Sequence, residues 1–252
     1  MRLKERTAIV TGSAAGLGAA IAEKFAENGA NLALWDLNED GLIEMKKKLE
    51  QYNTKIEYYK INLTNYDEVQ KIGEQTIRDF NKIDILVNCA GGGSELNLGF
   101  RELDEISWKN QIDLNLNSAF YCVKAVIEHM IEKNYGKIVN LSSVAGMRGG
   151  GLLGRGAYST AKAGIIGFTK ALAKEFAEFG IYANTVAPSL HVTPLIKSKL
   201  NLEQIEELKN SFLIKNGGDP EKLAELVTFL ASDDAQFITG ALYTVDGGYS
   251  LH

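Results

Sequence analysis

The chain has 252 residues and a formal charge of −5, with 27 lysines and arginines against 32 aspartates and glutamates. A chain of this length can bury a sizeable core without disulfides or metals, and 45% hydrophobic residues is ordinary for a globular protein. The modest acidity disfavours nucleic acid and anionic membranes as main partners, because both select clustered positive charge.

Other features exclude further classes of protein. No stretch approaches the ~20 apolar residues that span a bilayer, and the charged start of the chain is unlike a signal peptide. Only Cys89 and Cys122 are present, which predicts a reducing compartment, the cytoplasm, instead of a secreted disulfide framework. The histidines, His129, His191 and His252, have no metal-ligand spacing, so we expect no metal site.

Apolar runs of strand length alternate with longer amphipathic segments along the whole chain. Leu17, Ile21 and Phe25 recur every four residues and form the apolar stripe of a first helix, which Gly29 ends. Strand–helix–strand repetition predicts an α/β fold, a doubly wound parallel seven-stranded sheet with helices on both faces. The expected strands are Ala8 to Val10, Asn31 to Trp35, Lys55 to Ile61, Ile83 to Val87, Lys137 to Leu141, Ile181 to Ala187 and Ala241 to Val245. No composition break or low-complexity linker interrupts residues 1–252, so we expect a single domain.

The expected first strand ends in a glycine-rich run, Thr11-Gly12-Ser13-Ala14-Ala15-Gly16-Leu17-Gly18. Glycines here let the backbone approach a pyrophosphate, whose charge meets the N-terminus of the following helix. The spacing is G-x-x-x-G-x-G, not the usual G-x-G-x-x-G, and a glycine turn without a ligand is the alternative.

Asp36 ends the second expected strand, where a carboxylate can accept hydrogen bonds from both adenosine ribose hydroxyls. The same charge repels the 2′-phosphate of NADP, so Asp36 favours NAD. A strand-end aspartate that starts a turn is the alternative interpretation. None of the neighbouring positions that could hold a phosphate-binding cation is basic: Ser13, Ala14, Ala15 and Leu37.

Tyr158 and Lys162 are four residues apart in a helical segment and therefore share a face. This spacing occurs at the level expected by chance and is not diagnostic alone. A tyrosine with a pKa of about 10 needs a nearby cation before it can act as an acid or base. Lys162 is placed to supply that cation.

Further motifs accompany these residues in a fixed order. They are Asn88-Cys89-Ala90-Gly91, Ser142-Ser143, Tyr158-Ser159-Thr160-Ala161-Lys162, Asn184-Thr185-Val186-Ala187-Pro188, Thr239-Gly240 and Val245-Asp246-Gly247-Gly248. With the glycine run, they resemble the classical short-chain dehydrogenase/reductases of the NAD type over nearly the whole chain. The resemblance implies a single-domain Rossmann fold, with cofactor binding in about residues 1–145 and catalytic and substrate-binding elements in about residues 88–252.

The resemblance also implies a catalytic tetrad. Tyr158 would be the general acid/base, and Lys162 would lower its pKa and bind the nicotinamide ribose. Ser143 would orient the substrate oxygen, and Asn115 would hold a water for proton relay. The implied NAD contacts are Gly12, Ser13, Ala15, Gly16, Leu17, Gly18, Asp36, Leu37, Asn62, Leu63, Asn88, Ala90, Gly91, Tyr158, Lys162, Pro188, His191 and Thr193.

Departures from the family pattern concern the substrate side. Ser189 replaces the usual glycine, and His191 replaces an aliphatic residue, with its ring either turned away or in contact with substrate. The segment between Ser143 and Tyr158 is longer than is common in the family. Arg148 and Arg155 lie in that segment and either bind an anionic substrate group or are solvated. Asn62 stands where many relatives have an aspartate beside the adenine.

We therefore expect an NAD(H)-dependent oxidoreductase that interconverts a secondary alcohol and its ketone, with a small-molecule alcohol or ketone as partner. The first alternative is a 3-oxoacyl-thioester reductase acting on acyl carrier protein or coenzyme A esters, which Asp36 disfavours because biosynthetic reduction usually uses NADPH. A non-catalytic dinucleotide-binding or scaffold protein is the second alternative. The resemblance also implies a homotetramer, because two apolar segments, Asp113 to Ile131 and Tyr158 to Phe179, are similar to the helices that pair across a twofold axis in the family. The sequence does not name the substrate, its stereochemistry or the physiological direction.

Overall fold

The structure, a computed structural model, describes residues 1–93, 98–151, 154–215 and 217–251. Its centre is a seven-stranded sheet in the order β3-β2-β1-β4-β5-β6-β7, and every pairing is parallel. The strands are β1 (Thr7–Thr11), β2 (Asn31–Asp36), β3 (Ile56–Lys60), β4 (Ile85–Asn88), β5 (Gly136–Leu141), β6 (Ile181–Pro188) and β7 (Leu242–Val245). The expected α/β fold is confirmed, with strand ends that differ from the expected ones by one or two residues.

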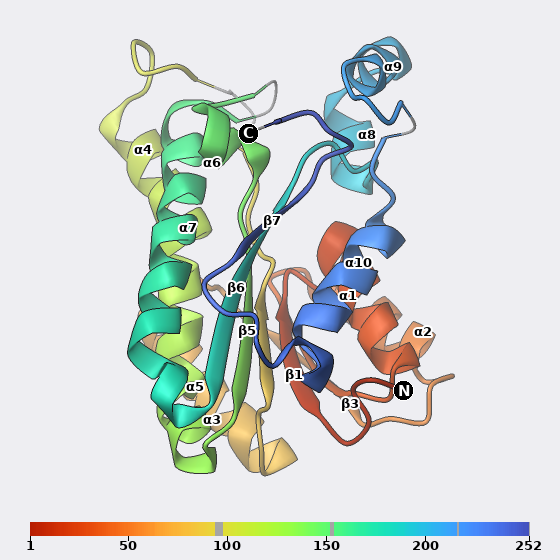
Figure 1. Ribbon diagram of the computed structural model, residues 1–252, viewed down its shortest axis with the longest axis vertical. Helices are drawn as coiled ribbons and strands as arrows, with labels where there is room; N and C mark the ends of the chain where they lie inside the picture. The colour runs from red at the N-terminus through yellow and green to blue at the C-terminus, as the bar shows by residue number, and fades with distance from the viewer. Residues whose placement is uncertain (94–97, 152–153, 216, 252) are drawn as a thin grey trace.

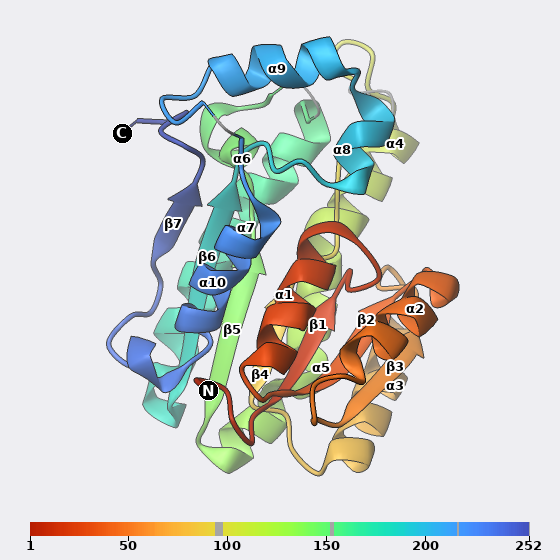
Figure 2. The same ribbon diagram turned by 90° about the vertical axis from the view of Figure 1, so that its right-hand side faces the viewer.

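Helices cover both faces of the sheet (Figure 1). On one face lie α1, α2 and α10, and on the other lie α3, α5 and α7, while α6, α8 and α9 lie beyond the carboxyl ends of the strands (Figure 2). The helices are α1 (Gly16–Glu27), α2 (Glu39–Leu49), α3 (Tyr66–Phe80), α4 (Glu105–Ile112), α5 (Ser118–Lys133), α6 (Val144–Arg148), α7 (Gly156–Phe176), α8 (Pro194–Lys199), α9 (Leu202–Asn210) and α10 (Pro220–Leu230). No helix in the described part of the chain is long and apolar enough to cross a membrane.

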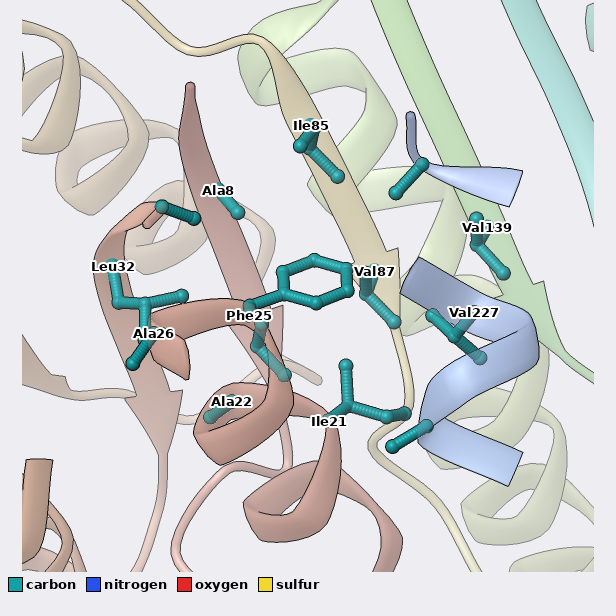
Figure 3. Close-up of a cluster of buried hydrophobic side chains, with 14 of the residues drawn as sticks. Ala8, Ile21, Ala22, Phe25, Ala26, Leu32, Ile85, Val87, Val139 and Val227 are labelled. Atoms are coloured by element: carbon teal, nitrogen blue, oxygen red, sulfur yellow. The ribbon is translucent and has the colours of Figure 1, made fainter. Parts of the chain in front are cut away.

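One hydrophobic cluster shows how the first helix is seated. The apolar stripe of α1 places Ile21 and Phe25 against Val87 of β4 and Val139 of β5, and Val227 of α10 packs beside them (Figure 3). All five side chains are buried. This packing fixes the N-terminus of α1 beside the end of β1.

The strand order reverses at β1, because the chain runs outwards to β3 and then returns to β4 on the other side. Connections leave β1 and β4 in opposite directions, so a crevice opens at their carboxyl ends. In open parallel sheets this switch point is the usual ligand site.

Candidate active site

The glycine run forms a tight turn between β1 and α1. Gly12 and Gly16 have φ of +68° and +61°, which favour glycine. A Cβ at Gly12 would lie 2.9 Å from Ala90 Cα, and one at Gly18 would lie 2.1 Å from Gly12 O. The N-cap residue of α1, Ala15, offers no side-chain cap, so the first backbone N–H groups of α1 are left for a ligand.

Thr11, which sequence reasoning did not single out, links the end of β1 to the end of β4 and the loop that follows β4. Its hydroxyl accepts hydrogen bonds from Cys89 N and Ala90 N, both at 3.0 Å, and donates to Val87 O at 3.3 Å. A threonine directly before the first glycine, at a strand end, is the signal that could have identified it.

Asp36 holds the end of β2 at the edge of the same crevice. Its Oδ2 accepts from Ala14 N at 3.0 Å, and its Oδ1 accepts from Asn38 N at 2.9 Å. Lys60, the neighbour of Asp36 in the β2–β3 ladder, forms an ion pair with Glu39 at 3.1 Å. Both oxygens of Asp36 therefore stay fixed, and the charge of the adjacent lysine is compensated.

The candidate acid/base group, Tyr158, lies near the start of α7. Burial raises the pKa of Tyr158 above its ordinary value, and a side-chain hydrogen bond with Ser143 lowers it in part. Ser143 caps α6, and its Oγ also accepts from Ala145 N at 3.1 Å. Tyr158 and Ser143 are thus brought together as expected from the family pattern.

Lys162, one turn further along α7, is buried and donates a hydrogen bond to Leu141 O at 2.9 Å. Its ammonium lies 5.9 Å from the centroid of the Tyr158 ring. Burial lowers the pKa of Lys162 to about 8. The lysine therefore satisfies its buried charge with the carbonyl at the end of β5.

Asn115 lies in a π-helical segment, Asp113–Asn117, between α4 and α5. Its Oδ1 accepts from Gly92 N at 2.9 Å, and its Nδ2 donates to Gly92 O and to Gln111 O, both at 3.1 Å. A Cβ at Gly91 would lie 2.6 Å from Asn115 Oδ1 and 3.2 Å from Lys162 Nζ. The loop after β4 therefore packs closely against both side chains.

Asn88 differs from the expected cofactor contact. Its Nδ2 donates to Asn140 Oδ1 at 2.8 Å, and Asn140 Nδ2 donates to Thr169 Oγ1 at 2.9 Å. This buried chain of amides links β4 and β5 to α7, so Asn88 supports the helix of Tyr158 from within the sheet. Ser13 also turns inward, and its Oγ donates to Trp35 O at 3.5 Å.

The expected catalytic residues other than Asn115 meet in one cleft of about 860 Å³, a size typical of cofactor sites. Of the expected cofactor contacts, all except Ser13 and Asn88 line it. Residues expected only as parts of longer segments, or not at all, also line it: Gln111, Leu114, Val144, Leu190, Ile196, Leu208, Phe212 and Tyr249.

His191 is buried, and its ring packs flat against Gly218. A Cβ at Gly218 would lie 2.6 Å from three atoms of the ring. His191 Nδ1 lies 3.3 Å from Ser189 O, its Nε2 is buried with no hydrogen-bond partner among the described residues, and burial lowers the pKa of the ring. This geometry favours the interpretation in which a neutral ring is turned away from the substrate.

The two loop arginines have different surroundings. Arg148 donates from Nη1 to Tyr249 O at 3.2 Å, and its guanidinium carbon lies 4.2 Å from the centroid of the Tyr249 ring. Arg155 is exposed and borders a small separate cavity beside Tyr158. Neither lines the large cleft, and two residues of their loop, 152 and 153, lie outside the described residues.

Gly154 lies directly against the Tyr158 ring. A Cβ there would be 2.1 Å from Tyr158 Cδ1 and 2.5 Å from its Cε1, whereas a Cβ at Gly151 would meet nothing within 4 Å. Gly151 N donates to Gly154 O at 2.8 Å. The loop therefore approaches the tyrosine as closely as the absence of a side chain allows.

Glycines and an uncapped helix at the switch point, with a tyrosine one helical turn from a buried lysine in the same cleft, are typical of dinucleotide-dependent oxidoreductases. A family model described as enoyl-(acyl carrier protein) reductase matches residues 12–250. The chain belongs to this family, which is one of the short-chain dehydrogenase/reductases.

Relatives and solved structures match the chain over nearly its whole length. It is 35% identical over 248 residues to a 3-oxoacyl-(acyl-carrier-protein) reductase of Thermotoga maritima, covering 98% of this chain and 99% of the relative. It is 34% identical over 247 residues to a 2-dehydro-3-deoxy-L-rhamnonate dehydrogenase (NAD(+)) of Sphingomonas sp., covering 98% and 96%. The crystal structure of levodione reductase superposes with a TM-score of 0.92 at 27% identity, covering 98% of both chains.

These likenesses establish the coarse function. The protein is an oxidoreductase of a family that binds a nicotinamide dinucleotide and acts on small-molecule substrates.

The contact between Gly154 and Tyr158 is tested by Gly154→Ala. The added methyl group must displace the ring towards solvent, so Tyr158 should ionise at lower pH than in the parent protein. The measurement is an ultraviolet titration of each protein against its Tyr158→Phe counterpart. Gly151→Ala, whose methyl group meets open space, should leave the titration unchanged, and equal effects of the two variants would contradict this account.

Burial of Lys162 makes stability depend on pH in a defined window. Its pKa is about 8 in the fold and about 10.4 in an unfolded chain, so the unfolded state binds more protons between these values. Stability contributed by this group therefore rises with pH across the window. Relative to Lys162→Met, the parent protein should gain up to about 3 kcal/mol between pH 7 and pH 10.5.

The measurement is urea unfolding of both proteins across that pH range. Lys170→Met, at an exposed position of the same helix, is the control and should show no such trend. A parent-minus-variant difference that stays constant with pH would show that the ammonium is not desolvated.

Proposed function

We propose that the protein is an NAD(H)-dependent dehydrogenase that interconverts a secondary alcohol and its ketone. The observation that carries the proposal is the convergence of Ser143, Tyr158 and buried Lys162 on the cleft that the glycine turn and Asp36 also line. The tyrosine and serine can act on one substrate oxygen, and the lysine supplies positive charge behind them.

The residues of the cleft fit a dinucleotide. The uncapped N-terminus of α1 suits the pyrophosphate, and Asp36 suits the adenosine ribose hydroxyls. Pro188 and Thr193 line the part of the cleft that follows β6, and we assign the nicotinamide to them. We further propose that about residues 1–145 supply most of the cofactor contacts, and that the catalytic and substrate-binding elements lie in about residues 88–252.

The bound nicotinamide would accept a hydride from the alcohol or return one to the ketone. Tyr158 takes the hydroxyl proton in oxidation and gives it back in reduction, while Ser143 orients the substrate oxygen. Lys162 stabilises the phenolate through its charge. Asn115, locked to the loop after β4, is assigned to hold a water that relays the proton to solvent.

Asp36 is the basis for choosing NAD over NADP. Both of its oxygens are held at the edge of the cleft, and a 2′-phosphate would meet this charge. Leu37 beside it is exposed and offers no cation, and Lys60 is paired with Glu39.

Reduction of a 3-oxoacyl thioester is the second candidate. The relative from Thermotoga maritima bears that name, while the relative from Sphingomonas sp. is named as an NAD(+) dehydrogenase. Asp36 favours the dehydrogenase. A non-catalytic binder is disfavoured, because a buried lysine costs stability that nucleotide binding alone does not require.

The assembly we infer is a homotetramer. Phe120 of α5 is 43% exposed, and its ring meets Phe168 of α7 edge-on at 6.5 Å. Strand β7 is an edge strand whose four residues are all incompletely buried. A helix face and a strand edge of this kind suit pairing with further copies of the chain.

Cofactor choice is tested by the double variant Asp36→Ala with Leu37→Arg. Loss of the carboxylate and gain of a cation should move the ratio of kcat/KM values from NAD towards NADP. The single variant Leu37→Arg should keep the preference for NAD, because Asp36 still repels the phosphate. Initial rates with each cofactor give the ratio, and an unchanged ratio in the double variant would contradict the role of Asp36.

The role of Tyr158 is tested by Tyr158→Phe. Only the proton-transfer group is lost, so turnover should fall about 10²- to 10⁴-fold while NADH binding persists. Alcohol oxidation measured as NADH absorbance and NADH binding measured by fluorescence separate the two effects. Tyr66→Phe, at an exposed tyrosine, is the control. Retention of more than about a tenth of the parent activity is incompatible with the proposed role.

A further inference from the structure

We propose that the substrate of this site has an uncharged, apolar body, and that Phe212 and Tyr249, held in place by Arg148, select it. The inference rests on the proposed function and goes further, because it names the substrate class and the residues that choose it. It also gives Arg148 a role that differs from the anion contact considered from the sequence.

The order of the strands separates the cleft into two ends. The glycine turn and Asp36 follow β1 and β2, whereas Ser143, Leu190 and Tyr249 follow β5, β6 and β7. Figure 2 shows α9 and the C-terminal segment at the upper end of the second group of strands. Beyond Ser143 and Tyr158, the cleft is thus enclosed in part by the turn after α9 and by the C-terminal segment, which carry none of the assigned cofactor contacts.

Apolar side chains predominate at this end, where Ser189 and Thr193 are polar but uncharged. Charged side chains among the described residues that line the cleft are Asp36, at the opposite end, and Lys162, which is held by Leu141 O. His191 contributes no charge, because burial lowers its pKa. The apolar lining residues of this end are Val144, Leu190, Ile196, Leu208, Phe212 and Tyr249. A charged substrate group placed among them would be desolvated without a partner, which is costly.

Phe212, Tyr249 and Arg148 form what we call the substrate wall, and Arg148 contacts Tyr249 within it. Its guanidinium stacks on the Tyr249 ring and donates to the Tyr249 carbonyl, so it covers the outer side of the tyrosine instead of facing the cleft. The Tyr249 ring in turn meets Phe212 edge-on, with centroids 5.2 Å apart. Phe212 is buried, and this stack is of the kind that stabilises aromatic pairs.

The backbone on both sides of the stack is also fixed. Asp246, itself buried, accepts hydrogen bonds from Gly248 N at 3.0 Å and from Ser250 N at 2.9 Å. Ile214 N donates to Gly247 O at 3.0 Å, which ties the turn after α9 to the C-terminal segment. The wall is therefore a rigid, shaped surface, which is what selection among substrate bodies requires.

The substrate class is tested with two ketones of similar size, 4-methylcyclohexanone and 4-oxocyclohexanecarboxylate. Their binding to the protein saturated with NAD, which cannot reduce a ketone, is measured by calorimetry, so that the comparison does not depend on turnover. The neutral ketone should bind about tenfold or more tightly than the carboxylate. Equal binding, tighter binding of the carboxylate or binding of neither would overturn the inference.

The wall is tested with Arg148→Ala against the matched loop variant Arg155→Ala. Arg148→Ala should weaken binding of the neutral ketone by about fivefold to tenfold and leave NADH affinity unchanged. Arg155→Ala should alter neither. If Arg148→Ala weakened only the carboxylate, the arginine would be an anion contact and the inference would be wrong. Failure of the proposed function is separate, because it would appear as absent NADH binding or absent alcohol oxidation with every secondary alcohol tried.

Discussion

The close approach of two backbone segments, at Gly12 and Ala90, is the constraint on which the cleft depends. It requires a residue without Cβ at Gly12, and the Thr11 hydroxyl holds the loop after β4 at that distance. Gly18 lets α1 begin immediately beside the turn, because any side chain there would meet Gly12 O. The uncapped N-terminus of α1, the end of β2 and the loop after β4 then surround the same space.

Buried polarity is the second constraint, and it connects the cofactor side to the reacting groups. Lys162 lies in low-dielectric surroundings with one carbonyl as its acceptor, next to Asn115 and to a glycine that allows both to fit. The hydrogen bonds from Asn88 to Asn140 and from Asn140 to Thr169 connect β4 and β5 to α7, the helix that carries Lys162. Such a site lowers stability, and under the proposed function its charge near a phenol serves proton transfer.

The sequence predicted those features that depend on hydrophobic periodicity and on the backbone freedom of glycine. The alternation of strands and helices predicted the parallel sheet. Gly12, Gly16 and Gly18 predicted the tight turn, because glycine adopts backbone conformations that other residues avoid. Side-chain direction is not contained in such patterns. Ser13 and Asn88 occupy the expected positions but turn into the protein, since Trp35 O and Asn140, distant in sequence, offer them partners. For the same reason the partner of Arg148, about a hundred residues later, could not be anticipated.

The substrate wall combines residues that are distant in sequence. Helix α6 connects this wall to Ser143, which lies at the start of the helix. Ser143 caps the start of this five-residue helix, and Arg148 ends it. The serine that would orient the substrate oxygen and the arginine that holds Tyr249 are therefore positioned by the same short rigid element. Relatives named for different substrates match this chain over nearly its whole length, so we infer that substrate choice resides in segments such as the turn after α9 and the C-terminus. Because these segments contact the reacting centre through α6, the body of the substrate can change without moving the groups that transfer its proton.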